Sequence, residues 1–180
     1  MKLNLHRIQT PIGTLLLVTD AQNVVRALDY ERYEARMHRL LGDHYGDYEL
    51  NDASDISPVE ANLQRYFAGD LHALDDIEVA FQGSTFQTRV WSALREIPPG
   101  VTISYGELAA RLGLSDPKSA FEVGQANATN PIALIVPCHR VVGKNGDIKG
   151  YAGGVHRKQW LLAHENADIV RGSTARLEGF

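Results

Sequence analysis

The spacing of apolar residues changes near residue 80, and this change most constrains the fold. Before it, apolar and polar residues alternate in three short segments, as in strands that bury one face: Leu3–Gln9, Thr14–Thr19 and Val24–Tyr30. After it, apolar residues recur every three or four positions, as in helices. We predict an α+β chain with an N-terminal α/β domain, residues 1–82, and a mostly helical C-terminal domain, residues 83–180.

The N-terminal part is predicted to hold an antiparallel meander and two helices. Helical spacing covers Tyr33–Leu41. A second helix is predicted from Ser57 to about Phe67, because Ser-Pro-Val-Glu combines a cap, a proline in the first turn and a capping-box glutamate. Residues 42–56 are rich in Asp, Gly and Asn, which predicts a loop.

The C-terminal part contains a pattern typical of a helix-turn-helix. Phe86–Ile97 is predicted to be helical, and a capping box starts a second helix at Tyr105 that Gly113 ends. Asp116-Pro117 then starts a helix that runs to about Ala128. The second helix of such a pair can enter a DNA groove, although short helix pairs of this spacing also serve as scaffold.

Composition excludes several classes of protein. With 44% hydrophobic and 22% charged residues the chain is typical of globular proteins, and no apolar run approaches a membrane span. The N-terminus lacks the apolar core of a signal peptide. One cysteine cannot form an internal disulfide or a multi-cysteine zinc site, and the seven histidines show no metal spacing. We expect a cytoplasmic protein with no metal, no cofactor and no membrane partner.

Charge is distributed unevenly along the chain. Residues 1–80 carry seven basic and fourteen acidic side chains, whereas residues 81–165 carry nine basic and six acidic ones. The second region could therefore approach nucleic acid, which the first would repel. Two ordinary solvated surfaces would give the same counts.

The predicted helix after Asp116 is rich in small residues, including Ser119, Ala120 and Gly124. Small side chains allow another backbone to come close. That backbone is either a packed helix or a nucleic acid, and spacing alone does not separate the two.

The chain's only cysteine follows a buried segment. Asn130-Pro131 ends the preceding helix, and the apolar run Ile132–Val136 leads into Pro-Cys-His-Arg at 137–140. A cysteine reacts as its thiolate, and a free pKa of about 8.5 leaves little thiolate at pH 7. His139 is the natural base for Cys138, but adjacent residues do not share a helix face, so we expect a bridging water.

A carboxylate should orient that histidine, as in other catalytic triads. Glu165, at the end of a predicted helix Val155–Glu165, is the candidate, while Glu107 and Glu122 are weaker ones. A lone cysteine is more often a structural residue, but the Pro-Cys-His-Arg context favours a nucleophile.

A glycine-rich stretch follows the cysteine. Asn145-Gly146 predicts a type I′ turn. Gly150–Gly154, with one aromatic residue, would suit the wall of a flat pocket or an ordinary loop into the last helix.

Residues 85–165 resemble the O6-alkylguanine-DNA alkyltransferase family. The matching residues are Phe86-Gln87, Trp91, Ser104-Tyr105-Gly106, Asn130-Pro131, Ile135–Val141, Gly150–Gly154, Arg157-Lys158, Trp160–Leu162 and His164-Glu165. The first 80 residues match more loosely, at Thr10–Gly13 and Tyr66–Gly69.

The resemblance implies a single-turnover repair enzyme that moves the alkyl group of O6-alkylguanine, or of O4-alkylthymine, from double-stranded DNA to its own cysteine as a monomer. It implies an RNase H-like N-terminal sheet. Roles follow for these residues: Cys138 accepts the alkyl group, His139 and Glu165 activate it, Asn130 braces the site, Tyr105 helps to flip the base, Val136, Tyr151, Ala152 and Arg140 contact the base, and Phe121, Ser119, Ala120, Gly124 and Asn127 contact DNA.

One departure from the family pattern concerns the DNA helix. An arginine normally fills the gap left by the flipped nucleotide, and here Phe121 occupies its place, followed by Glu122. Phenylalanine can wedge and stack but cannot hydrogen-bond the orphaned base. We therefore expect weaker DNA binding than is usual for the family.

Two other classes compete with this interpretation. A lesion-binding or helix-turn-helix DNA-binding protein with impaired transfer would share the helices. A cysteine hydrolase would share the thiol, but the sequence shows no oxyanion signature for one.

Overall fold

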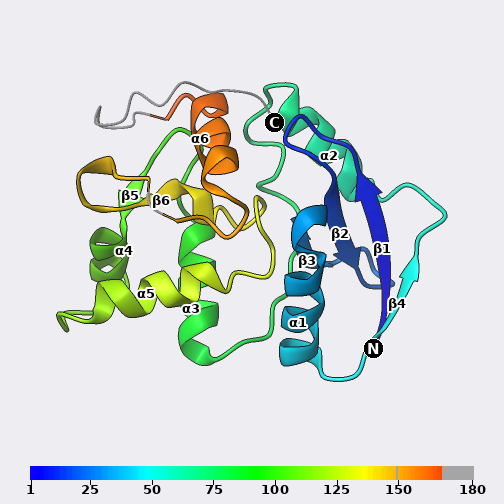
Figure 1. Cartoon of the computed structure of the whole chain (residues 1–180), viewed down its shortest axis with the longest axis horizontal. Coiled ribbons are helices and arrows are strands. Elements are labelled where there is room, and N and C mark those ends of the chain that lie inside the picture. Colours follow the sequence, from blue (N-terminus) through cyan, green and yellow to red (C-terminus); the bar gives the residue numbers. More distant parts are fainter. Residues whose placement is uncertain (149, 168–180) are drawn as a thin grey trace. The chain divides into compact units, whose positions relative to one another are not determined.

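The computed structural model describes residues 1–148 and 150–167, and it is a mixed α+β structure (Figure 1). It divides into two compact units: unit 1 comprises Met1–Gly83 and Pro131–Ile135, and unit 2 comprises Ser84–Asn130 and the chain from Val136 onward. Within the described ranges, no helix is long and apolar enough to cross a membrane.

Unit 1 is built on a four-stranded sheet in the order β3-β2-β1-β4. The strands β1 (Lys2–Ile8), β2 (Leu15–Thr19) and β3 (Val25–Tyr30) form the expected antiparallel meander. All five residues of the central strand β2 are buried, because the sheet is covered on both faces.

The sheet is mixed, which corrects the antiparallel prediction. Residues 42–56 were expected to be loop, but they contain the strand β4 (Glu49–Asp52), which pairs parallel with β1. Three of its four side chains are polar and exposed, and only Leu50 packs against the core, so periodicity does not reveal the strand. Backbone bonds hold it, including Glu49 N–H to the carbonyl of Met1 at 2.8 Å.

Helices complete unit 1. A 3₁₀ turn (η1, Glu31–Tyr33) leads into α1 (Glu34–Tyr45), which runs four residues further than predicted. The core between α1 and the sheet contains Leu3, Leu5, Leu16, Val18, Ala27, Met37 and Leu41. The helix α2 (Pro58–Phe67) starts where the capping residues predict, with the Ser57 hydroxyl accepting from Val59 N–H.

Among its described residues, unit 2 contains four α-helices and a two-stranded parallel sheet. The helices are α3 (Thr85–Arg95), α4 (Tyr105–Arg111), α5 (Ser119–Ala128) and α6 (Val155–His164), and the strands are β5 (Ile103–Ser104) and β6 (Val141–Val142). Trp91 of α3 is fully buried and donates its indole N–H to Ala126 of α5 at 2.8 Å. This bond ties α5 to the core of the unit.

The helix α5 starts two residues later than predicted. Asp116 caps a turn rather than the helix, since its carboxylate accepts from Lys118 N–H at 2.8 Å, and the first helical residue is Ser119, not Pro117. The connection between α4 and α5 is therefore longer than the sequence suggests.

The apolar run before the cysteine returns to unit 1. Leu28 of β3 donates to the carbonyl of Pro131 at 3.0 Å and accepts from Ala133 N–H at 2.9 Å. Leu134, buried in this segment, has φ +69°, a backbone region that costs a non-glycine residue free energy. The segment is buried, as predicted, and it is anchored by bonds to a strand more than one hundred residues earlier.

Candidate active site

Cys138 begins a single 3₁₀ turn, Cys138–Arg140 (η2). Its side chain is almost fully buried, with 4% exposed, and its N–H donates to the carbonyl of Val136 at 2.8 Å. The thiol is therefore held in a fixed place at the end of the buried segment.

His139 lies wholly inside unit 2 and meets the carboxylate of Glu165. Its Nε2 lies 2.9 Å from Oε1 of Glu165, which is the C-terminal cap of α6. Among the residues that the structure describes, its other ring nitrogen, Nδ1, is buried and has no hydrogen-bond partner. The pairing of His139 with Glu165 agrees with the sequence prediction.

The charges of this cluster determine which nitrogen of His139 carries the proton. Burial lowers the pKa of His139, and this effect exceeds the opposing charge of Glu165. Burial by itself would raise the pKa of Glu165, but the contacts with His139 and Arg140 lower it below its ordinary value. A neutral imidazole facing a carboxylate donates from Nε2, so Nδ1 carries the lone pair.

Arg140, which the resemblance places at the base, bonds to this carboxylate in the structure. Its Nε and Nη2 donate to the two oxygens of Glu165 at 3.0 and 2.9 Å, and Nη1 donates to the carbonyl of Ile97 at 2.5 Å. The guanidinium is buried and fully engaged within the protein. Its role is to keep Glu165 ionised and oriented.

Lys158 is a site residue that the sequence interpretation missed. It is completely buried, and its Nζ donates to the carbonyl of Val141 at 2.5 Å. Burial lowers the pKa of Lys158 to about 8, and the nearby charge of Cys138 opposes that change. The available signal is its position three and four residues before the buried Leu161 and Leu162, on the inner face of α6.

Tyr105, the first residue of α4, lies against α5. A Cβ atom at Gly124 would lie 3.8 Å from the Tyr105 ring, an ordinary van der Waals distance, so the ring lies next to Gly124. Burial and then the charge of Cys138 raise the pKa of Tyr105, and a hydrogen bond from the side chain of Asn127 opposes them. Tyr105 therefore lies within electrostatic range of the thiol.

Asn130 links the end of α5 to the segment before the cysteine. Its side-chain amide donates to the carbonyl of Val136 at 2.8 Å, and the residue is buried. This bond joins the residue that follows α5 and its C-cap to the segment before Cys138. Val136 is also buried, whereas Tyr151 and Ala152 are half-buried.

The sequence and fold of known proteins match this chain. The family description "6-O-methylguanine DNA methyltransferase, DNA binding domain" matches residues 85–167. The methylated-DNA–protein-cysteine methyltransferase of Salmonella typhimurium is 49% identical over 162 residues, covering 89% of this chain and 94% of the relative. That of Methanosarcina acetivorans is 39% identical, covering 88% and 96%. The chain belongs to the methylated-DNA–protein-cysteine methyltransferase family.

Solved structures of this family agree in fold. The structure of Mycobacterium tuberculosis OGT in complex with DNA superposes with a TM-score of 0.74 at 38% identity, covering 92% of this chain and 93% of that one. A Pyrococcus kodakaraensis methyltransferase, at 23% identity and a TM-score of 0.66, shows the same fold.

The residues expected to contact DNA divide into two groups on α5. Phe121 is 69% exposed, and Ala120 and Gly124 are half-buried. Ser119 and Asn127 are buried. Phe121 and Ala120 line a pocket with Tyr105, Gly106, Glu107, Ala110, Ser104 and Lys144.

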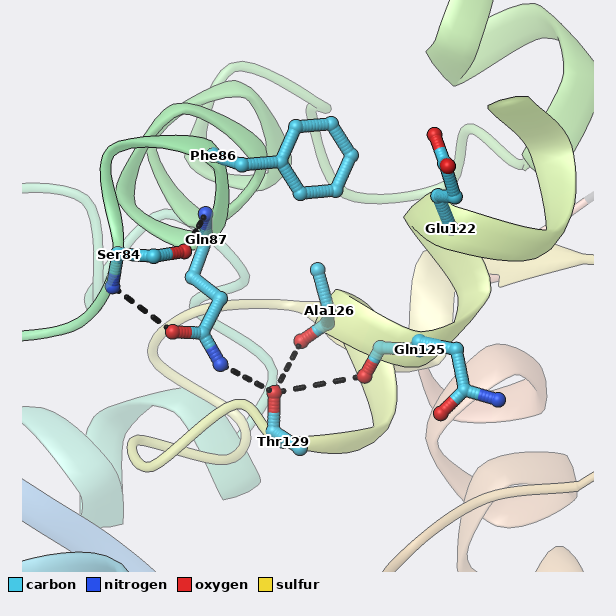
Figure 2. A pocket seen from close by; sticks show the side chains of 7 residues that line it. All are labelled: Ser84, Phe86, Gln87, Glu122, Gln125, Ala126 and Thr129. Carbon is cyan, nitrogen blue, oxygen red and sulfur yellow. Dashed lines mark hydrogen bonds between the residues drawn. The ribbon is translucent and has the colours of Figure 1, made fainter. Parts of the chain in front are cut away.

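A second pocket of unit 2 lies between α3 and α5 (Figure 2). Figure 2 shows Phe86 on one side and Glu122 on the other, with the Gln87 side chain bonded to both Ser84 and Thr129. No residue of the cysteine cluster lines this pocket, so it is separate from the thiol. Glu122 is exposed here, and Glu107 belongs to the α4 capping box, so neither weaker candidate orients His139.

Proposed function

We propose that Cys138 accepts the alkyl group of O6-alkylguanine in double-stranded DNA, once per molecule and without a cofactor. The observation that carries the proposal is the buried imidazole of His139, held at Nε2 by Glu165 and unpartnered at Nδ1 within the described residues, beside a buried cysteine. This arrangement has the parts of an activated nucleophile.

In this proposal His139 takes the thiol proton at Nδ1 through a bridging water. Glu165 stabilises the imidazolium that forms, and Arg140 keeps Glu165 ionised. The ammonium of Lys158 lies close enough to the thiolate for the two charges to stabilise each other.

The thiolate then attacks the alkyl carbon attached to O6. A carbon–sulfur bond forms as the carbon–oxygen bond breaks, and the proton that left the thiol neutralises the guanine. The product is a thioether, which has no easy leaving group, so each molecule reacts once. The same chemistry applies to O4-alkylthymine.

Delivery of the base requires that it leave the helix stack, because a buried thiol does not reach a stacked base. We propose that α4 and α5 act as a helix-turn-helix in a C-terminal domain, 83–180, with Tyr105 and Phe121 beside the flipped nucleotide. Residues 1–82 would form an RNase H-like supporting domain of a cytoplasmic monomer.

Intact mass spectrometry tests the proposal after incubation with a duplex containing O6-methylguanine. We expect one added methyl group, located on the Cys138 peptide, in stoichiometric yield. Cys138→Ala should acquire none. A chain that binds the duplex tightly and gains no methyl group would instead support the lesion-binding alternative. That alternative does not require the pairing of His139 with Glu165.

A further inference from the structure

Two arginines of unit 2 converge on one pocket at the surface. Arg89 of α3 and Arg111, the last residue of α4, line it together with Ser92 and Glu96. The volume of the pocket, about 410 Å³, is within the range of small-ligand sites. None of these four residues lines either of the two pockets described above, so this is a third, separate site of unit 2.

The two guanidinium groups keep most of their N–H donors for a ligand. Nη2 of Arg89 donates to the carbonyl of Leu112, the C-cap of α4, at 2.9 Å, and this bond holds the side chain in place while using one donor. Within the described part of the chain, Arg111 makes no hydrogen bond or ion pair, although the charge of Glu107, one turn earlier, attracts it. Two exposed guanidinium groups with unused donors suit an anion that has several acceptor oxygens.

The carboxylate of Glu96 opposes the two arginines in this pocket. It follows the last residue of α3 as the C-cap and is exposed. The pocket thus carries two positive charges and one negative charge, which leaves it positive. An anion bound here would be attracted by the arginines and repelled by Glu96, so removing the two kinds of charge should have opposite effects.

The pocket lies beside the surface that the proposed function assigns to DNA. Arg111 directly follows Ala110, which lines the pocket of Phe121, so the two pockets lie on neighbouring sides of α4. In a helix-turn-helix the first helix crosses the phosphate backbone and the second enters the groove. Here α4 is the first helix of the pair, and α5 contains no lysine or arginine. The arginine pocket therefore offers cations on the helix that would cross the backbone.

We propose that Arg89 and Arg111 bind a phosphate of the DNA backbone and so supply affinity that α5 does not. The inference rests on the proposed function, and it adds a contact that carries no information about the base. A free phosphate ion has the same chemistry as a backbone phosphate, and the experiment separates these two sources.

The first measurement is binding to an undamaged duplex at three salt concentrations. We expect Arg111→Gln to weaken binding about 5- to 10-fold, the value of one hydrogen-bonded contact, and to reduce the slope of log K against log salt by about 0.9. Glu96→Gln should tighten binding about 2- to 5-fold, as for one exposed charge pair. Arg39→Gln is the control, because it removes an exposed arginine from the acidic residues 1–80 and should leave affinity and slope unchanged.

The second measurement locates the contact with duplexes in which one phosphate at a time is replaced by a neutral methylphosphonate. At one position the replacement should weaken binding of the wild type and have no effect on Arg111→Gln or Arg89→Gln. Because Arg111 is exposed and makes no bond within the described residues, its variant decides even if Arg89→Gln disturbs the end of α4.

Three results would overturn the inference: Arg111→Gln binds duplex as tightly as the wild type, Arg39→Gln loses as much affinity, or no phosphate position loses its effect in Arg111→Gln. If inorganic phosphate then binds the wild type and not Arg111→Gln, the pocket takes a small anion instead of DNA. Methyl transfer from O6-methylguanine tests the proposed function separately. Normal transfer together with any of these three results would leave that function standing without the phosphate contact.

Discussion

At the scale of single residues, Glu165 holds two partners at once. One carboxylate accepts from the imidazole of His139 and from two nitrogens of Arg140, and all three side chains are buried. Removing the charge leaves a buried guanidinium without its counterion and a histidine without its orienting acceptor.

We therefore expect Glu165→Gln to slow methyl transfer by about 100-fold, because general-base assistance by His139 is lost. We also expect it to lower the free energy of unfolding by about 3 kcal/mol, because a buried ion pair is broken. Single-turnover kinetics and urea unfolding measure the two effects. Glu107→Gln is the control, since Glu107 is an exposed residue of a capping box in which glutamine makes the same bond, so the change should alter stability and transfer little. Equal effects of the two variants would contradict the assignment.

Acid should weaken the fold through Glu165. Because its pKa in the folded chain lies below the ordinary 4.5, the stability it contributes is present above about pH 4.5 and is lost as pH falls through the lower, folded value. Between about pH 5 and pH 3 the free energy of unfolding should fall more steeply in the wild type than in Glu165→Gln. If the free energies of unfolding of the wild type and of Glu165→Gln, measured by urea titration, fall equally over this pH range, the expectation is wrong.

Lys158 should act in the opposite direction at alkaline pH. Its folded pKa of about 8 lies below the ordinary 10.5, so the unfolded chain binds the proton more tightly and stability rises as pH passes from 8 to 10.5. The rise should reach about 3 kcal/mol at most. The check is to measure the difference in unfolding free energy between the wild type and Lys158→Met, once at pH 8 and once at pH 10. An equal difference at the two pH values would contradict a lowered pKa for Lys158.

At the scale of elements, α5 differs from what a DNA-contacting helix requires. It contains no lysine or arginine, and its exposed face carries Phe121 and Glu122. Contacts to phosphate from cationic side chains supply much of the affinity of DNA-binding proteins. In the proposed function, the helix would therefore contribute to DNA binding through apolar contact and shape.

Phe121→Arg should tighten binding to an undamaged duplex and steepen the dependence of log K on log salt by about 0.9, the effect of one added phosphate contact. Titrations at three salt concentrations measure both. Gln125→Arg adds the same charge elsewhere on the exposed face of α5, so a similar gain there would mean that charge, rather than the place of Phe121, sets the affinity. An unchanged affinity in Phe121→Arg would contradict the prediction that a cation at position 121 strengthens DNA binding.

At the scale of the whole molecule, Cys138 is linked to unit 1 through the chain itself. Residues 131–135 are bonded to Leu28 of β3, and Cys138 follows three residues later. Loss of the unit 1 sheet would release the segment that holds the thiol in place.

Leu17→Ala, in the fully buried β2, should lower the free energy of unfolding by about 2–5 kcal/mol. We expect the urea concentration at which half of the methyl transfer is lost to fall together with the urea concentration at which half of the sheet is unfolded. Hydrogen exchange of the β2 amides measures the unfolding of the sheet. Ile56→Ala, at an exposed position, should move neither. Transfer that persists after the sheet has unfolded would contradict the coupling.

The amino-acid sequence determined the features whose bonds are local. The starts of α2 and α4 follow from Ser57 and Ser104, because a capping hydroxyl and the N–H that it satisfies lie within three residues of each other. The burial of residues 132–136 follows from their apolar composition. The Pro-Cys-His-Arg motif predicts that Cys138 is the nucleophile and that His139 is its base.

Tertiary structure decided the features whose partners lie far apart in the chain. The polar strand β4 forms because backbone bonds to β1 need no apolar pattern. Arg140 and Lys158 count toward a basic region in the sequence, yet both are buried, because Glu165 and backbone carbonyls satisfy them inside unit 2. A charged side chain enters a core only where such partners converge, and that convergence is a property of the fold rather than of neighbouring residues.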